Sequence, residues 1–159
     1  MTSKYVASFI KFLEDKGLLT FNVIGEDEES FVNRLKIQKY VFLAKYYGLN
    51  FGYGHSMYRY GPYSPSLAAD YYKLAESSKM YNTESKESLP KLFDSNNFMS
   101  LVKEKDTSWL EIATTLLDQK NRFENENELV KHVERIKCDY PISYIKGVLK
   151  DLKSKNLMS

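Results

Sequence analysis

Residues 31–47 read FVNRLKIQKYVFLAKYY, and this apolar run organises the amino-terminal part of the chain. Its apolar side chains recur at helical spacing and form one broad arc: Phe31, Leu35, Ile37, Val41, Phe42, Ala44 and Tyr46. So wide an arc predicts a helix that is covered on several sides. Gln38 falls inside the arc, and a buried amide needs partners for its donors and its acceptor. We therefore expect Gln38 to hydrogen-bond to the backbone of a facing loop, with a ligand contact as the alternative.

The segments on either side of this helix carry clear start and stop signals. The acidic run at residues 26–29 predicts a helix start, because carboxylates are favourable at a helix N-terminus. Gly48 predicts the end of the helix, and the alternation over residues 49–60 predicts a short, glycine-interrupted hairpin or a pair of extended segments. We expect Gly61-Pro62 to form a turn. Ser64-Pro65 should then cap a helix that runs through about Ala75.

The carboxyl-terminal half has a more regular helical pattern. Residues 82–87 are predicted as a loop and residues 89–93 as a short helical turn. The polar run at 94–97 is the best boundary, which divides the chain into parts 1–94 and 98–159 that can also pack as one compact domain. Three helices should follow, with Ser108 capping the first and with Leu129, Val133 and Ile136 buried on the second: 108–121, 127–137 and 143–155.

These elements predict a mainly helical α+β protein. Its amino-terminal part is helical with a short β-hairpin, and its carboxyl-terminal part is a three-helix unit that resembles a helix-turn-helix. A winged version would need a strand pair after Leu157, where few residues follow, so we expect the wing to be absent or vestigial.

Charge and cysteine content restrict the classes of function. The chain has 159 residues, with 23 Lys and Arg against 21 Asp and Glu, so any attraction to nucleic acid or to a membrane must be local. Cys138 stands alone, which excludes an internal disulfide and any multi-cysteine metal site and predicts a reducing, cytoplasmic setting. No apolar run approaches the roughly 20 residues that span a bilayer. We expect no membrane association, no metal and no cofactor.

Tyrosine is concentrated in one part of the chain. Ten of the thirteen tyrosines lie between Tyr40 and Tyr81. Their phenol rings have three interpretations: a packed seam between a helix and the hairpin, an exposed surface for protein recognition, or a platform for stacking bases of a single strand. Nearby Lys36, Lys39, Lys45 and Arg59 support the third interpretation.

Two segments resemble a known family. The first, RLKIQKYVFLA at residues 34–44, resembles the K-L-Q-K-L-x-Y-L-A helix of the Panacea domain, the SocA-like antitoxin family, and of the uncharacterised YwgA-like family. The second, YRYGPYSPSL at residues 58–67, is similar to the x-Y-G-P-x-x-P-x-L segment that follows the hairpin in both families. Residues 109–113 and the helical tail look more like the YwgA type. Motif identity carries over to five residues: Gln38, Lys39, Tyr60, Gly61 and Pro62.

The resemblance implies a non-enzymatic binding protein, since Panacea-type domains neutralise a partner by binding it. We therefore predict a protein-interaction module of antitoxin-like or regulatory type, with a protein partner such as a toxin. Self-association as a homodimer is left open. The residues expected to contact the partner are Tyr53, His55, Tyr58, Arg59, Tyr63, Tyr71 and Tyr72.

Catalysis and DNA binding are the competing classes. The sequence has no glycine-rich phosphate loop, no nucleophile elbow and no paired-histidine metal motif. The one acid/base candidate is a cluster of four residues: His55, Tyr58, Arg59 and Asp70. A lone histidine in a glycine-rich loop is more often a turn residue, and we therefore assign no catalytic residue. Lys146, Lys150 and Lys153 fall on one face of the last helix and could reach phosphates, which makes a DNA-binding regulator the alternative function. A solvated lysine face explains the same pattern.

Overall fold

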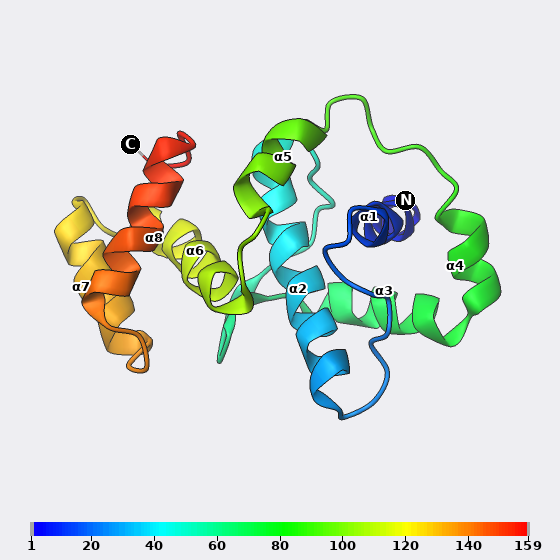
Figure 1. Ribbon diagram of the computed structural model, residues 1–159, viewed down its shortest axis with the longest axis horizontal. Helices are drawn as coiled ribbons and strands as arrows, with labels where there is room; N and C mark the ends of the chain where they lie inside the picture. Colours follow the sequence, from blue (N-terminus) through cyan, green and yellow to red (C-terminus); the bar gives the residue numbers. More distant parts are fainter. Residues whose placement is uncertain (1, 159) are drawn as a thin grey trace.

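The computed structural model describes residues 2–158, and its helices make up most of the chain (Figure 1). The predicted α+β class, mainly helical with one short hairpin, is confirmed. In chain order the elements of the described part are α1 (Thr2–Asp15), α2 (Glu28–Ala44), the 3-10 turn η1 (Lys45–Tyr47), β1 (Ser56–Tyr58), β2 (Gly61–Tyr63), α3 (Pro65–Glu76), α4 (Ser78–Glu84), α5 (Ser95–Val102), α6 (Thr107–Gln119), the 3-10 turn η2 (Lys120–Arg122), α7 (Glu126–Ile136) and α8 (Ile142–Ser154).

Helix α2 lies at the centre of the molecule. In Figure 1 it stands between α1, α3 and α4 on one side and α6, α7 and α8 on the other. It packs against α6, β2 and α3, and every residue from Ile37 to Ala44 is buried, so the prediction of a helix covered on several sides is confirmed. The acidic run begins the helix as predicted, because Asp27 caps it and accepts from the backbone N–H of Ser30. Phe31 differs from expectation, since it is 37% exposed at the amino-terminal end of α2.

The hairpin spans residues 56–63, whereas the sequence predicts it within residues 49–60. Tyr58 pairs with Gly61 and Met57 with Pro62, so Arg59 and Tyr60 form the turn and Gly61-Pro62 lies in β2. The prediction of a Gly61-Pro62 turn is therefore wrong. Gly61 is needed for a different reason: its φ of 101° lets the chain leave the turn and enter β2. The next helix begins as predicted, since the Ser64 side chain accepts from the Leu67 N–H and Pro65 opens α3.

The middle of the chain holds more helix than its polar sequence predicts. Helix α4 occupies residues 78–84, which overlap the predicted loop at 82–87, and no helix forms at 89–93. The polar run at 94–97 begins α5, with Asp94 as N-cap accepting from the Asn97 N–H. These polar residues serve as helix caps, and capping residues are the same types that favour loops. The division into parts 1–94 and 98–159 stays a prediction.

The last three helices form one packed group. Helices α6, α7 and α8 each contact the other two, and their bounds fall within two residues of the prediction. The expected Ser108 cap is wrong, because Asp106 accepts from the Trp109 N–H and begins α6 two residues earlier. Ile136 is also not buried as expected; it is 43% exposed, while the next residue, Lys137, is only 6% exposed. Over the described residues, no helix has both the length and the apolar character needed to cross a bilayer.

Candidate functional site

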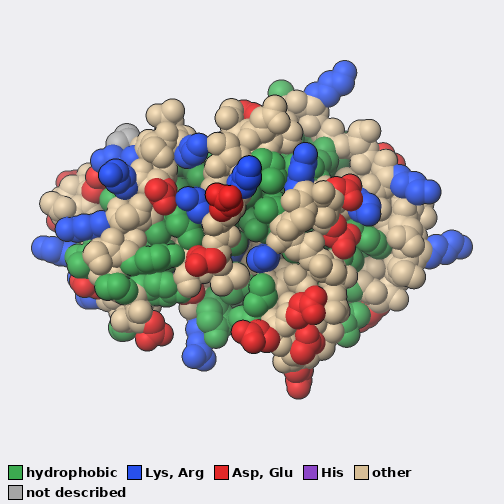
Figure 2. All heavy atoms as spheres, in the orientation of Figure 1, with side chains coloured by type: hydrophobic (Ala, Val, Ile, Leu, Met, Phe, Trp, Pro, Cys, Tyr) green, Lys and Arg blue, Asp and Glu red, His purple; other side chains and the backbone are tan. Residues whose placement is uncertain are grey.

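A cavity of about 260 Å³ lies where α2, the hairpin and α3 meet. Figure 2 shows hydrophobic side chains gathered at the surface over the hairpin, with both basic and acidic side chains nearby. Residues from both motifs and from the tyrosine cluster line this space: Phe31, Arg34, Leu35, Gln38, Lys39, Tyr58, Arg59, Tyr60, Gly61, Tyr63, Tyr71 and Tyr72. The structure thus brings together five of the seven predicted partner-binding residues and four of the five motif residues.

A buried amide fixes the floor of the cavity. Gln38 donates to the Ser64 carbonyl (3.0 Å) and accepts from the Ser64 N–H (2.9 Å). This two-way bond holds the end of the hairpin and the start of α3 against α2. The predicted bond from Gln38 to the backbone of a facing segment is confirmed.

Lys39 lies next to this amide and is almost completely buried. Its side chain is 2% exposed, and its ammonium donates to the Pro62 carbonyl at 2.7 Å. Burial and, to a lesser extent, the like charge of Lys137 lower the pKa of Lys39 to about 7, although Glu111 and Asp118 act in the opposite direction. Lys39 therefore changes charge near neutral pH, which an ordinary lysine does not.

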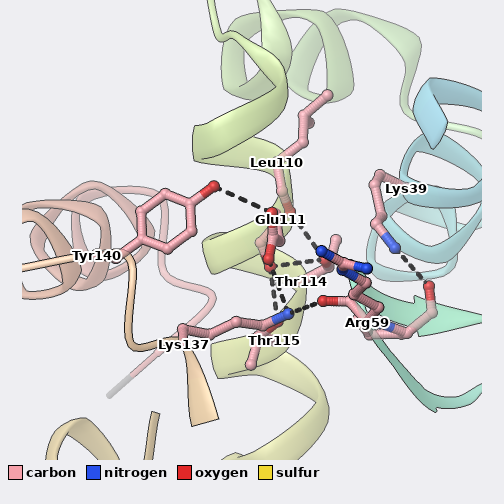
Figure 3. Close-up of polar contacts among 9 residues, drawn as sticks. Lys39, Arg59, Leu110, Glu111, Thr114, Thr115, Lys137 and Tyr140 are labelled. Atoms are coloured by element: carbon pink, nitrogen blue, oxygen red, sulfur yellow. Dashed lines mark hydrogen bonds and ion pairs between the residues drawn. The ribbon is translucent and has the colours of Figure 1, made fainter. Parts of the chain in front are cut away.

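Behind the hairpin, a buried ion pair connects three parts of the fold (Figure 3). The Lys137 ammonium lies 2.7 Å from Glu111 Oε2 and donates to the Arg59 carbonyl at 2.8 Å. The other oxygen of Glu111 accepts from the Tyr140 hydroxyl at 3.0 Å. The hairpin turn, α6 and the segment between α7 and α8 are therefore held by one set of polar contacts.

Aromatic rings form the rim of the cavity. The ring of Phe31 meets that of Tyr60 edge to face with centroids 5.1 Å apart, and Tyr58 lies 5.0 Å from Tyr63. Tyr58 and Tyr60 are 51% and 39% exposed. Tyr71 is different, since it is 1% exposed and forms an inner wall, where burial raises its pKa. Rings that are half in water and half packed suit recognition of another molecule.

Tyr53 and His55 lie outside the cavity. The Tyr53 hydroxyl donates to Asp70 on α3, and its ring packs near Phe51. His55 packs edge to face against Phe42, and its Nε2 is buried without a hydrogen-bond partner among the described residues. Burial and the nearby Lys45 lower the pKa of His55 to about 4, so the imidazole is neutral at physiological pH.

The three lysines of the alternative DNA site lie on α8. Lys146, Lys150 and Lys153 are all exposed and border an open depression together with Leu149. Lys153 is paired with Glu126 Oε1 on α7 at 3.0 Å, so part of its charge is already balanced. This face is separate from the aromatic cavity.

Sequence reasoning missed several residues of the site. The sequence pattern places Arg34 and Leu35 in the motif of α2 and Phe31 in its apolar arc, but all three residues line the cavity. Lys137 was missed altogether, because its burial depends on a hairpin carbonyl 78 residues away in the sequence. The position of Phe31 at the first turn of α2 was the one signal for its exposure, since helix ends project beyond the core.

Comparison with known proteins adds no assignment. Scans against family models, curated proteins and solved structures each returned no match. The similarity to the Panacea and YwgA-like families therefore stays a prediction from the two motifs.

Proposed function

We propose that this chain is a non-enzymatic protein-interaction module of antitoxin-like or regulatory type, and that the aromatic cavity is its binding site. One observation carries the proposal: the two family-like motifs and most of the clustered tyrosines surround a single surface cavity. If the tyrosines served only to pack the core, the burial of Tyr71 would be explained. The exposure of the Tyr58 and Tyr60 rings would not be.

The size of the cavity favours a side chain of a partner protein over a cofactor. Pockets for drug-sized ligands and cofactors usually measure about 300–1,000 Å³. This one, at about 260 Å³, lies below that range. Binding energy at protein interfaces is concentrated in such pockets, where a few anchor side chains meet Tyr, Trp and Arg.

The charges around the cavity indicate the kind of partner. Arg34, Lys39 and Arg59 are its charged lining residues, and no Asp or Glu of residues 2–158 lines it. A segment that combines apolar and acidic side chains fits this surface by charge. We therefore propose that the occupant is such a segment of a partner protein, and a toxin encoded beside this chain is the first candidate.

Binding to that candidate tests the proposal. The purified partner should bind the wild-type chain and lose at least about tenfold in affinity with Tyr58→Ala or Tyr60→Ala, since truncating hot-spot aromatics costs ≥ ~2 kcal/mol. Leu92→Ala is the matched control, because Leu92 is 85% exposed and lies outside the cavity. Equal binding by wild type, both tyrosine variants and the control would refute the proposed site.

A DNA-binding regulator is the second candidate. Three mutually packed helices with exposed Lys146 and Lys150 on α8 support it, whereas the pairing of Lys153 with Glu126 weakens it. On this candidate the helices form a helix-turn-helix-like unit with α8 toward the phosphates. Fluorescence anisotropy with a labelled duplex at low salt should then show binding that falls when Lys146 and Lys150 become Ala. Binding that is absent, or unchanged by both substitutions, removes this candidate.

A further inference from the structure

Lys39 lines the cavity, and its ammonium has unused hydrogen-bonding capacity. A lysine ammonium carries three N–H donors. In the part of the chain that the structure describes, Pro62 O is the acceptor of its one hydrogen bond, and no carboxylate lies within ion-pair distance. A buried cation with so few partners is unfavourable.

The nearest acidic group cannot supply the missing partner. Glu111 already binds Lys137 through one oxygen and Tyr140 through the other. Around the cavity the remaining charged lining groups, Arg34 and Arg59, are both cationic. Asp118 on α6 also acts on Lys39, but among the described residues no carboxylate pairs with this ammonium, so an ion-pair partner is left for an occupant to supply.

The cavity also offers apolar contact beside the ammonium. Tyr60 and Phe31 stand at the rim, and Tyr71 and Tyr72 pack ring to ring at 5.0 Å on the α3 side. An occupant that satisfies both features carries an apolar group and, a few bonds away, an anionic oxygen.

We propose that the anchor of the partner is an apolar side chain beside a carboxylate, and that this carboxylate pairs with the Lys39 ammonium inside the cavity. The inference rests on the proposed protein-interaction function and specifies what that site recognises. It assigns Lys39 as the residue that determines specificity, while the tyrosine rings supply the apolar contact.

The charge state of Lys39 makes this recognition depend on pH. The charged groups that act on it are Lys137 at the end of α7 and Glu111 and Asp118 on α6, and Arg59 in the hairpin turn lines the same cavity. Because burial brings the pKa of Lys39 to about 7, the ammonium is present below neutral pH and is lost above it. Binding of a carboxylate should therefore weaken as the pH rises.

A pair of small probes tests the inference without the partner. The full chain is titrated with 3-phenylpropionate and with its neutral analogue 3-phenylpropionamide, and binding is followed by NMR shifts of backbone amides at about pH 6. We expect shifts centred on Tyr60, Gly61 and Tyr72, with the acid binding about tenfold or more tightly, since charge-assisted hydrogen bonds are roughly twice as strong as neutral ones. Lys39→Met should remove this preference, and a change to about pH 8.5 should reduce it in the wild type.

Lys36→Met is the matched control, because Lys36 is on the same helix but donates to the Leu18 carbonyl, outside the cavity. It should keep the preference for the acid. Equal binding of acid and amide by the wild type, or an unchanged preference in Lys39→Met, would overturn the inference. If partner binding depends on Tyr58 but the chain binds the acid and the amide equally, this inference alone would be overturned. A carboxylate preference without such a partner would overturn the protein-interaction function alone.

Discussion

Replacing Lys137 with Met removes one member of the buried ion pair behind the cavity, and the structure indicates how large the loss should be. The side chains of Lys137 and Glu111 are 5% and 10% exposed, so solvent screens their interaction little. Among the described residues, the change leaves the buried Glu111 carboxylate with the Tyr140 hydroxyl as its one partner, and it removes the donor to the Arg59 carbonyl. Breaking a buried pair from one side costs about 3–5 kcal/mol. We expect that loss in the free energy of unfolding.

Urea denaturation followed by circular dichroism measures this loss, and an unchanged m-value would show that the unfolding transition is comparable. In a thermal scan the same loss corresponds to a fall in Tm of roughly 6–20 °C for a chain of this size. Lys131→Met on the exposed face of α7 is the control and should stay within about 0.5 kcal/mol of the wild type.

A double variant separates the pair from its surroundings. Adding Glu111→Leu to Lys137→Met removes the stranded carboxylate, so it should recover at least about 1 kcal/mol of the loss. A loss below about 1 kcal/mol for Lys137→Met alone, or no recovery in the double variant, would refute the reasoning that this pair is desolvated and jointly holds the hairpin to α6.

Three further predictions concern the cavity itself. Gln38→Leu leaves the Ser64 N–H buried without its partner, while the Ser64 carbonyl keeps the Ala68 N–H, so the urea midpoint should fall by the equivalent of about 1–3 kcal/mol; a loss below about 0.5 kcal/mol would contradict the role of the amide. Gly61→Ala should cost about 1–3 kcal/mol, because Gly61 has φ 101° and an added Cβ would lie 3.1 Å from Thr115 Oγ1. Gly54→Ala, where a Cβ meets nothing within 4 Å, is the control for the same denaturation measurement. Burial lowers the pKa of Lys39 from 10.5 to about 7. Between these two pH values the unfolded chain therefore keeps a proton on Lys39 that the folded chain has released. Stability of the wild type relative to Lys39→Met should therefore rise with pH across this window, by up to about 1.4 kcal/mol per pH unit, and a flat difference from pH 7 to 9 would show that Lys39 is charged throughout.

Helix starts and stops were predictable where the signal is local. Ser64-Pro65 begins α3 as expected, because a capping hydroxyl bonds to an N–H three residues on and proline suits the first turn. The same reasoning failed at Ser108, because Asp106 and Ser108 are both good caps and the structure uses Asp106. It failed at residues 94–97 because a cap and a loop use the same polar residue types.

The candidate site was predicted in composition but not in geometry. The tyrosine cluster and the two motifs pointed to the correct region, and Gln38 was correctly assigned to a backbone contact. Which tyrosines face the cavity did not follow, since Tyr53 turns to Asp70 while Tyr58 and Tyr60 reach the rim. Which side chains face the cavity depends on the hairpin register, and in this register Arg59 and Tyr60 form the turn.

The sequence alone established a mainly helical chain with a short hairpin, the central position of α2 and the buried amide of Gln38, because periodicity, capping and hydrogen-bond satisfaction act over a few residues. Only the tertiary structure decided that the two motifs and the tyrosines enclose one cavity, that Lys39 lies in it with a lowered pKa, and that Lys137 pairs with Glu111 behind it. These features arise because α2, the hairpin and α6 pack together and exclude water. A local sequence pattern does not show which residues, distant in the sequence, will be buried next to one another.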